Sequence, residues 1–77
     1  MGARMITKIG IVSGEILTIL ERMNRPMSIK SFESFLDEPS EMILMSIGWL
    51  AREGYIHLEM VEGECLISRM AEHYSPV

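Results

Sequence analysis

Two changes in hydrophobic period predict that this chain adopts a small α+β fold. In the first two thirds of the chain, apolar residues recur at helical spacing in three segments, which Pro26 and Pro39 separate. After Gly54 the period changes to two, and two short alternating segments follow. A chain of 77 residues suits one domain that buries roughly 60% of its surface. We therefore expect a single domain over residues 1–77, with an ordered core at about residues 6–69.

The first helix is predicted to run from Lys8 to Asn24. Its apolar stripe consists of Ile9, Val12, Ile16, Leu20 and Met23, widened by Leu17 and Ile19. Gly10 and Gly14 each cost about 1 kcal/mol of helix propensity relative to Ala. We therefore expect a neighbouring helix or strand to approach closely on their side. Pro26 ends this helix, because proline disfavours the helical conformation at the residue before it.

A short extended segment at Met27-Ser28 and a second helix, from Ile29 to Leu36, are predicted to follow the proline. Ser28 is the expected N-cap, because a serine hydroxyl can accept a hydrogen bond from the first helical turn. The inward face is expected to hold Ile29 and Phe32, together with either Phe35 or Leu36. The polar residues of this helix are expected to face water: Lys30, Ser31, Glu33 and Ser34.

The third helix is predicted to begin at Pro39, since proline at the first helical position between acidic residues is a strong start signal. Ser46 is small enough to lie against another helix, beside an inward stripe of Ile43, Ile47 and Leu50. Gly54 supplies the left-handed residue that ends the helix after a charged last turn. Two short helices joined by about three residues form a helix-turn-helix unit.

The last two segments predict a β-hairpin with its turn at Glu62-Gly63. In that register Met60 pairs with Cys65, and Leu58 pairs with Ile67. Both pairs are apolar, so one face of the hairpin is apolar and Cys65 is expected to be a small core residue. The resulting order of helix, short strand, helix, helix, strand and strand is that of a winged helix-turn-helix domain.

Several residues of the chain also match a known pattern. They are Ile9-Gly10 and Gly14 in the first helix, Ile47 and Ile56, and the more specific run Gly48-Trp49-Leu50-Ala51-Arg52-Glu53. In these residues the chain resembles a family of small bacterial and archaeal winged helix-turn-helix proteins of unknown function. The resemblance covers about residues 6–69 and implies a compact winged-helix fold with a link to transcription. It implies no ligand, reaction or operator, and therefore no site residues.

The chain departs from that family pattern at Gly54-Tyr55. The family often has a charged or polar pair at this place. The departure leaves Tyr55 as an additional aromatic residue near the start of a strand.

The charge of the chain opposes DNA binding. Eleven acids and seven bases give a net charge of -4, whereas nucleic-acid-binding domains usually concentrate Lys and Arg. In a DNA-binding winged helix, the outer residues of the third helix touch bases. Here these residues are Ser40, Glu41, Leu44 and Met45, and none is the Arg, Lys, Asn or Gln that pairs best with bases. The predicted wing tip, Glu62-Gly63-Glu64, is acidic as well.

DNA binding remains the alternative hypothesis, in the form of a transcriptional regulator that acts as a dimer. Pairing of two copies would concentrate the dispersed bases on one side. The candidate nucleic-acid contacts in that case are Lys30, Ser34 and Ser40.

The same surface of the third helix suits contact with a protein. Leu44, Met45 and Trp49 are predicted to lie on the side away from the inward stripe, and Tyr55 lies near them in the sequence. Exposed groups of this composition are typical of binding hot spots. In a competing interpretation Trp49 folds over the hairpin or the tail with Tyr55 or Tyr74 as covers, and Leu44 and Met45 pack against the first helix.

We favour a non-enzymatic interaction module that contacts a protein, or a second copy of itself, in a regulatory setting. No pattern predicts catalysis, a metal or a cofactor: Cys65 is the single cysteine, and His57 and His73 lie far apart. His57 and Cys65 fall on opposite faces of the predicted hairpin, which excludes a nucleophile and base pair. No segment approaches the ~20 apolar residues of a membrane span. No signal peptide is recognised, so we expect a cytoplasmic protein. No residue pattern indicates a small-molecule ligand.

Overall fold

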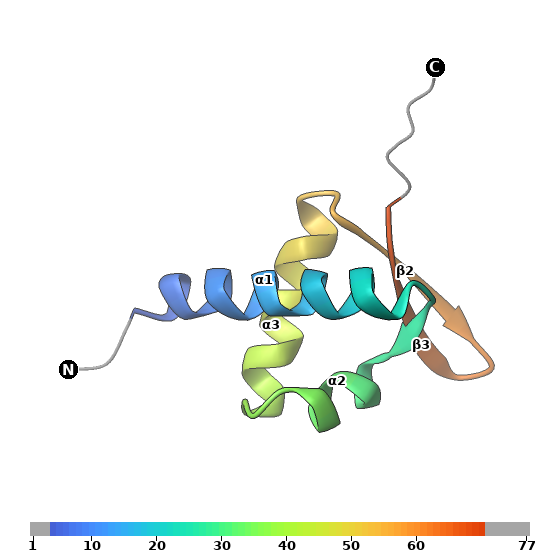
Figure 1. The fold of residues 1–77 in the computed structure, drawn as a ribbon, viewed down its shortest axis with the longest axis horizontal. Coiled ribbons are helices and arrows are strands. Elements are labelled where there is room, and N and C mark those ends of the chain that lie inside the picture. Colours follow the sequence, from blue (N-terminus) through green and yellow to red (C-terminus); the bar gives the residue numbers. More distant parts are fainter. Residues whose placement is uncertain (1–3, 71–77) are drawn as a thin grey trace, which may run out of the picture.

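The computed structural model describes residues 4–70 and has the predicted order of elements (Figure 1). The helices are α1 (Met5–Met23), α2 (Ile29–Phe35) and α3 (Ser40–Arg52), and the strands are β1 (Met27–Ser28), β2 (Ile56–Val61) and β3 (Glu64–Arg69). The strands form one antiparallel sheet in the order β1-β3-β2. This arrangement confirms the prediction of a winged helix-turn-helix domain.

α1 begins at Met5, three residues before the predicted start at Lys8. No proline or glycine interrupts the sequence between these two residues, so the helix continues toward the N-terminus, and its first turns project beyond α3 (Figure 1). At the other end, Asn24 adopts a left-handed φ of 53°, and its N–H donates to the carbonyl oxygen of Leu20. Asparagine tolerates this conformation better than most residues. Asn24 therefore ends the helix two residues before Pro26.

The prediction that Gly10 and Gly14 face a close neighbour is wrong. Both residues are exposed, and a Cβ added at either would meet no heavy atom within 4 Å. The small residues at the crossing of α1 and α3 are serines instead. Ser13 and Ser46 are buried, with the Ser13 hydroxyl 3.5 Å from the Ser46 carbonyl oxygen. The Ser46 hydroxyl also donates to the Met42 carbonyl oxygen at 2.8 Å, which satisfies it inside its own helix.

α2 begins at the predicted N-cap. The Ser31 N–H donates to the Ser28 Oγ at 3.3 Å. Phe32 is completely buried and Leu36 is half-buried, whereas Phe35 is 53% exposed. Of the two residues that the sequence left open, Leu36 completes the inward face.

α3 begins at Ser40, one residue after the predicted start. Pro39 has an extended conformation and acts as the N-cap, and its carbonyl oxygen accepts a hydrogen bond from the Met42 N–H at 3.0 Å. At the other end Gly54 has the predicted left-handed conformation, with φ of 85°. The Tyr55 N–H then donates to the Leu50 carbonyl oxygen at 3.0 Å, which turns the chain from α3 into β2.

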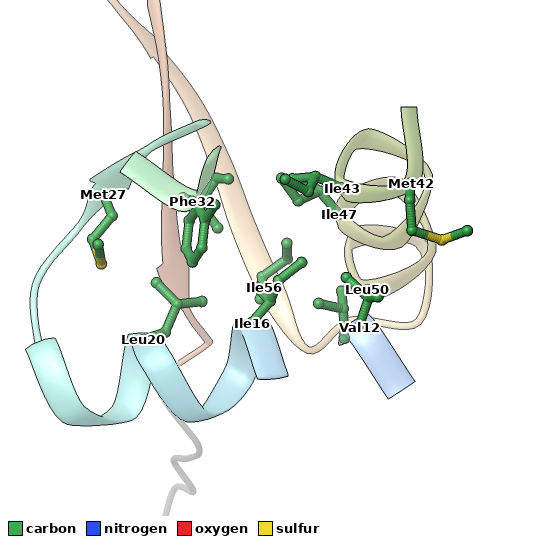
Figure 2. Close-up of a cluster of buried hydrophobic side chains, with 11 residues drawn as sticks. Val12, Ile16, Leu20, Met27, Phe32, Met42, Ile43, Ile47, Leu50 and Ile56 are labelled. Atoms are coloured by element: carbon green, nitrogen blue, oxygen red, sulfur yellow. The ribbon is translucent and has the colours of Figure 1, made fainter. Parts of the chain in front are cut away.

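The hydrophobic core lies between α1, α2, α3 and the base of the sheet (Figure 2). Its side chains come from every helix and strand: Val12, Ile16, Leu20, Met27, Phe32, Met42, Ile43, Ile47, Leu50, Ile56 and Ile67. The helical stripes predicted for the first and third helices supply most of them. Periodicity therefore predicted correctly which face of each long helix is buried.

The hairpin has the predicted register but extends beyond the core. Met60 pairs with Cys65 across a turn in which Glu62 and Gly63 both have positive φ. Along β2 only Ile56 is buried, and Met60 is 68% exposed. The prediction that Cys65 belongs to the core is therefore wrong, and its side chain is only half-buried. None of the three helices α1, α2 and α3 covers this part of the sheet, which projects as the wing (Figure 1).

Candidate functional site

The outward side of α3 carries a group of exposed apolar side chains. We call Leu44, Met45, Trp49 and Tyr55 the outer-face cluster, and all four are exposed. The first three lie on α3 opposite the stripe that enters the core, because their positions are out of phase with the buried residues of the same helix. Tyr55 follows the Gly54 turn and reaches back toward the helix. The cluster is thus built from the end of α3 and the turn into β2.

Trp49 and Tyr55 are in contact with each other. Their ring centroids lie 6.2 Å apart, with an angle of 25° between the planes, in a stacked arrangement. Such a pair contributes about 0.5–1.5 kcal/mol beyond its buried area and holds both rings in place. Trp49 nevertheless remains 40% exposed. Tyr55 covers one side of the indole, and Tyr74, the other cover considered, lies outside the described residues.

Leu44 and Met45 are 49% and 39% exposed, so neither is buried against α1. The contact between α1 and α3 runs through Ser13 and Ser46 on the opposite side of the helix. Gly48 lies about one helical turn after Leu44 and Met45 and is exposed, and a Cβ there would meet nothing within 4 Å. The helix surface beside Leu44 and Met45 is therefore open to solvent at this position.

The three candidate nucleic-acid contacts lie on α2 and at the start of α3. Lys30 is exposed. The Ser34 hydroxyl donates to the Ser31 carbonyl oxygen at 2.8 Å, and the Ser40 hydroxyl donates to Glu33 Oε2 at 2.9 Å. Within residues 4–70 no hydrogen bond joins Lys30 to either serine. Both hydroxyls are engaged, and the carboxylate beside Ser40 would repel a phosphate.

Charges near the start of α3 are mostly acidic. Lys8 on α1 forms an ion pair with Glu38, with 3.4 Å between Nζ and Oε2. Glu41 lies in the first turn of α3, where a negative charge is stabilised by the helix dipole. The wing tip adds Glu62 and Glu64. The helix that carries the outer-face cluster therefore begins with an acidic turn and ends with the base Arg52.

The described residues contain no constellation that indicates catalysis or metal binding. His57 pairs with Ser68 and Cys65 with Met60, so the imidazole and the thiol lie on opposite faces of the hairpin, as predicted. No group of three or more His, Cys, Asp or Glu residues within residues 4–70 could hold a metal ion. Over the same range, no helix is long and apolar enough to cross a membrane.

Comparison with known proteins agrees with the architecture. A family model described as a winged helix-turn-helix domain, DUF2582, matches residues 1–69. No curated protein and no solved structure matches the chain.

Proposed function

Because the chain belongs to the DUF2582 family of winged helix-turn-helix domains, we propose that it is a non-enzymatic interaction module that contacts a protein in a regulatory setting. The contact surface is the outer-face cluster of α3 together with the wing. The observation that carries this proposal is the exposure of Leu44, Met45 and Trp49 at the positions where a DNA-binding winged helix presents polar and basic side chains.

The composition of the outer-face cluster supports a protein partner. Trp and Tyr are enriched in binding hot spots, and Met adapts its shape to a partner because its side chain is flexible. The stacked Trp49 and Tyr55 rings are held in place before binding, so little side-chain entropy is lost at that point. Gly48 adds no side chain to this surface, so a partner can approach the backbone of α3 there.

The acids of the proposed contact surface indicate the charge of the partner. Glu41 lies in the first turn of α3, and the wing carries Glu62 and Glu64 at its tip. Complementary charges steer association and suppress wrong partners. We therefore expect a partner with an apolar centre and with basic side chains that face the start of α3 and the wing tip.

DNA binding by a dimer is the second candidate, supported by the general use of the fold. This support comes from analogy between folds, not from the chemistry of a site. Sedimentation equilibrium with mixed-sequence duplex DNA at low salt separates the two candidates. We expect the sedimentation of the protein to be unaffected by DNA. A complex that weakens steeply with salt would overturn the protein proposal in favour of DNA.

A photo-crosslinking amino acid at position 45 tests the protein contact directly. In cells that express the chain, we expect Met45 replaced by the crosslinker to form a discrete protein adduct. The additional substitution Trp49→Ala should abolish this adduct. The matched control carries the crosslinker at Ile11, which is also apolar and is more exposed than Met45 (55% against 39%) but lies on α1. Adducts of the same pattern and yield at both positions would show that the outer-face cluster is not a specific surface.

A further inference from the structure

β2 is an edge strand with unpaired backbone groups. Among residues 4–70 it pairs with β3 alone. The Met70 N–H donates to the Tyr55 carbonyl oxygen at 3.1 Å, and hydrogen-bonded pairs alternate along an antiparallel ladder. The residues that exchange hydrogen bonds with β3 are therefore the odd-numbered ones from Tyr55 onward. The N–H and C=O groups of Ile56, Leu58 and Met60 point away from β3, toward the open edge.

We propose that a second copy of the chain pairs with this edge across a two-fold axis at Leu58. This inference rests on the proposed function and adds to it a contact between two copies of the chain, at the β2 edge and not at the outer-face cluster. The two β2 strands then run antiparallel and join two three-stranded sheets into one. Leu58 lies opposite the partner's Leu58, and Ile56 lies opposite the partner's Met60. In this register the outward-pointing groups of each strand meet those of the other.

The side chains of β2 are complementary to themselves in this register. Directly opposed residues point to the same face, so Ile56, Leu58 and Met60 form one apolar layer with their equivalents. On the other face His57 lies opposite the partner's Glu59, and by symmetry Glu59 lies opposite the partner's His57. An imidazole N–H can donate to that carboxylate whether or not the ring is charged.

Charge complementarity also selects the register. An axis at Glu59 would place two Glu59 carboxylates opposite each other, and an axis at His57 would place two imidazoles together. An axis between two residues would place a residue whose N–H and C=O point to the open edge opposite one whose groups already bond β3, so the hydrogen bonds could not form. Of these axes, the one at Leu58 matches hydrogen bonds, apolar side chains and charges at once.

β2 lacks two of the common protections of an edge strand. Edge strands are commonly blocked by Lys or Pro, and β2 contains neither. Leu58 is 39% exposed on the apolar face. On the opposite face Tyr55 lies opposite the partner's Val61, and Tyr55 also belongs to the outer-face cluster. Pairing therefore covers exposed apolar surface and presents two outer-face clusters together.

Substitutions that change the charges of β2 test the register, with the dimer Kd measured by sedimentation equilibrium. We expect the unmodified protein to form a reversible dimer with a Kd on the order of micromolar, since two paired edges bury less than the ~1,600 Å² of a standard interface. His57→Glu creates two like-charge pairs with Glu59 and should raise the Kd roughly tenfold. The added substitution Glu59→Lys should restore dimerisation. Thr18→Glu, which adds an acid to the exposed side of α1, is the control and should leave the Kd unchanged.

A disulfide at the axis tests the geometry independently. In a Cys65→Ala background, Leu58→Cys places two thiols where Cα atoms of a hydrogen-bonded pair lie about 5.5 Å apart, which suits a disulfide. Met60→Cys is the control, because its two copies would lie on the order of 14 Å apart along the strands. We expect oxidation to give a covalent dimer at position 58 and none at position 60, although Met60 is the more exposed residue.

Several outcomes would overturn the inference. They are a protein that stays monomeric at millimolar concentration, a dimer whose Kd ignores His57→Glu, and equal disulfide formation at both positions. The proposed function fails separately, through the crosslinker at Met45, which lies on α3 and not on the β2 edge. A monomer that still crosslinks through Met45 would overturn the inference and leave the proposed function standing.

Discussion

Replacing Gly10 and Gly14 with alanine should stabilise the domain. Both glycines lie inside α1, where glycine is about 1 kcal/mol less favourable than alanine. A new Cβ at either position would meet no atom within 4 Å, so no clash reduces this gain. We therefore expect each substitution to raise the free energy of unfolding by about 1 kcal/mol, and the pair by about 2 kcal/mol, because helix propensities sum along a helix.

Urea unfolding followed by circular dichroism measures this effect. In a thermal melt of a domain of this size, a gain of about 1 kcal/mol in stability corresponds to a rise of roughly 4–8 °C in Tm. Gly54→Ala is the matched control, since its φ of 85° makes any side chain unfavourable, and it should lower stability by about 1 kcal/mol. A double alanine variant that is less stable than the unmodified protein would refute the exposed placement of these glycines. It would show that another surface approaches them closely.

Other substitutions test the core, a helix cap and the outer-face cluster. Phe32→Ala should cost about 3–5 kcal/mol, because Phe32 is completely buried, and should leave the domain largely unfolded in a thermal melt. Ser28→Ala should cost about 1 kcal/mol in urea unfolding, because it removes the acceptor for the Ser31 N–H; a loss of helix content without this cost would contradict the cap. Trp49→Ala should cost only about 1 kcal/mol, mainly its stacking on Tyr55, while it abolishes the crosslink from position 45. If Trp49→Ala unfolds the domain instead, the indole is a core residue and the outer-face cluster loses its anchor.

Much of the fold could be predicted because its signals are local. The Ser28 cap, the Gly54 end of α3 and the Glu62-Gly63 turn each act through backbone groups a few residues away. Helical and strand periods then identify the buried stripes of α1 and α3 and the register of the hairpin. The small departures, such as Pro39 acting as a cap instead of the first helical residue, fall at the ends of elements, where neighbouring conformations differ little in energy.

The candidate site could be predicted only in part. Periodicity placed Leu44, Met45 and Trp49 on the outward side of α3, but it left open whether another segment covers them. The structure leaves Trp49 exposed and stacked on Tyr55, a contact that depends on how the Gly54 turn directs the chain. The unpaired edge of β2 follows from the strand order, because β3 lies between β1 and β2.

The sequence by itself determined the order of the elements, the caps and turns between them, and the apolar stripes that build the core. The tertiary structure alone decided which surfaces the described residues leave uncovered. These are the side of α1 with Gly10 and Gly14, the part of the wing near its turn, where Cys65 is only half-buried, and the outer face of α3. The physical reason is that caps and periods depend on neighbours in the chain, whereas burial depends on which distant elements reach a surface. Serines, not glycines, lie where α1 crosses α3. The face that α1 turns toward α3 is set by the burial of all its core residues together, and not by the two glycines alone.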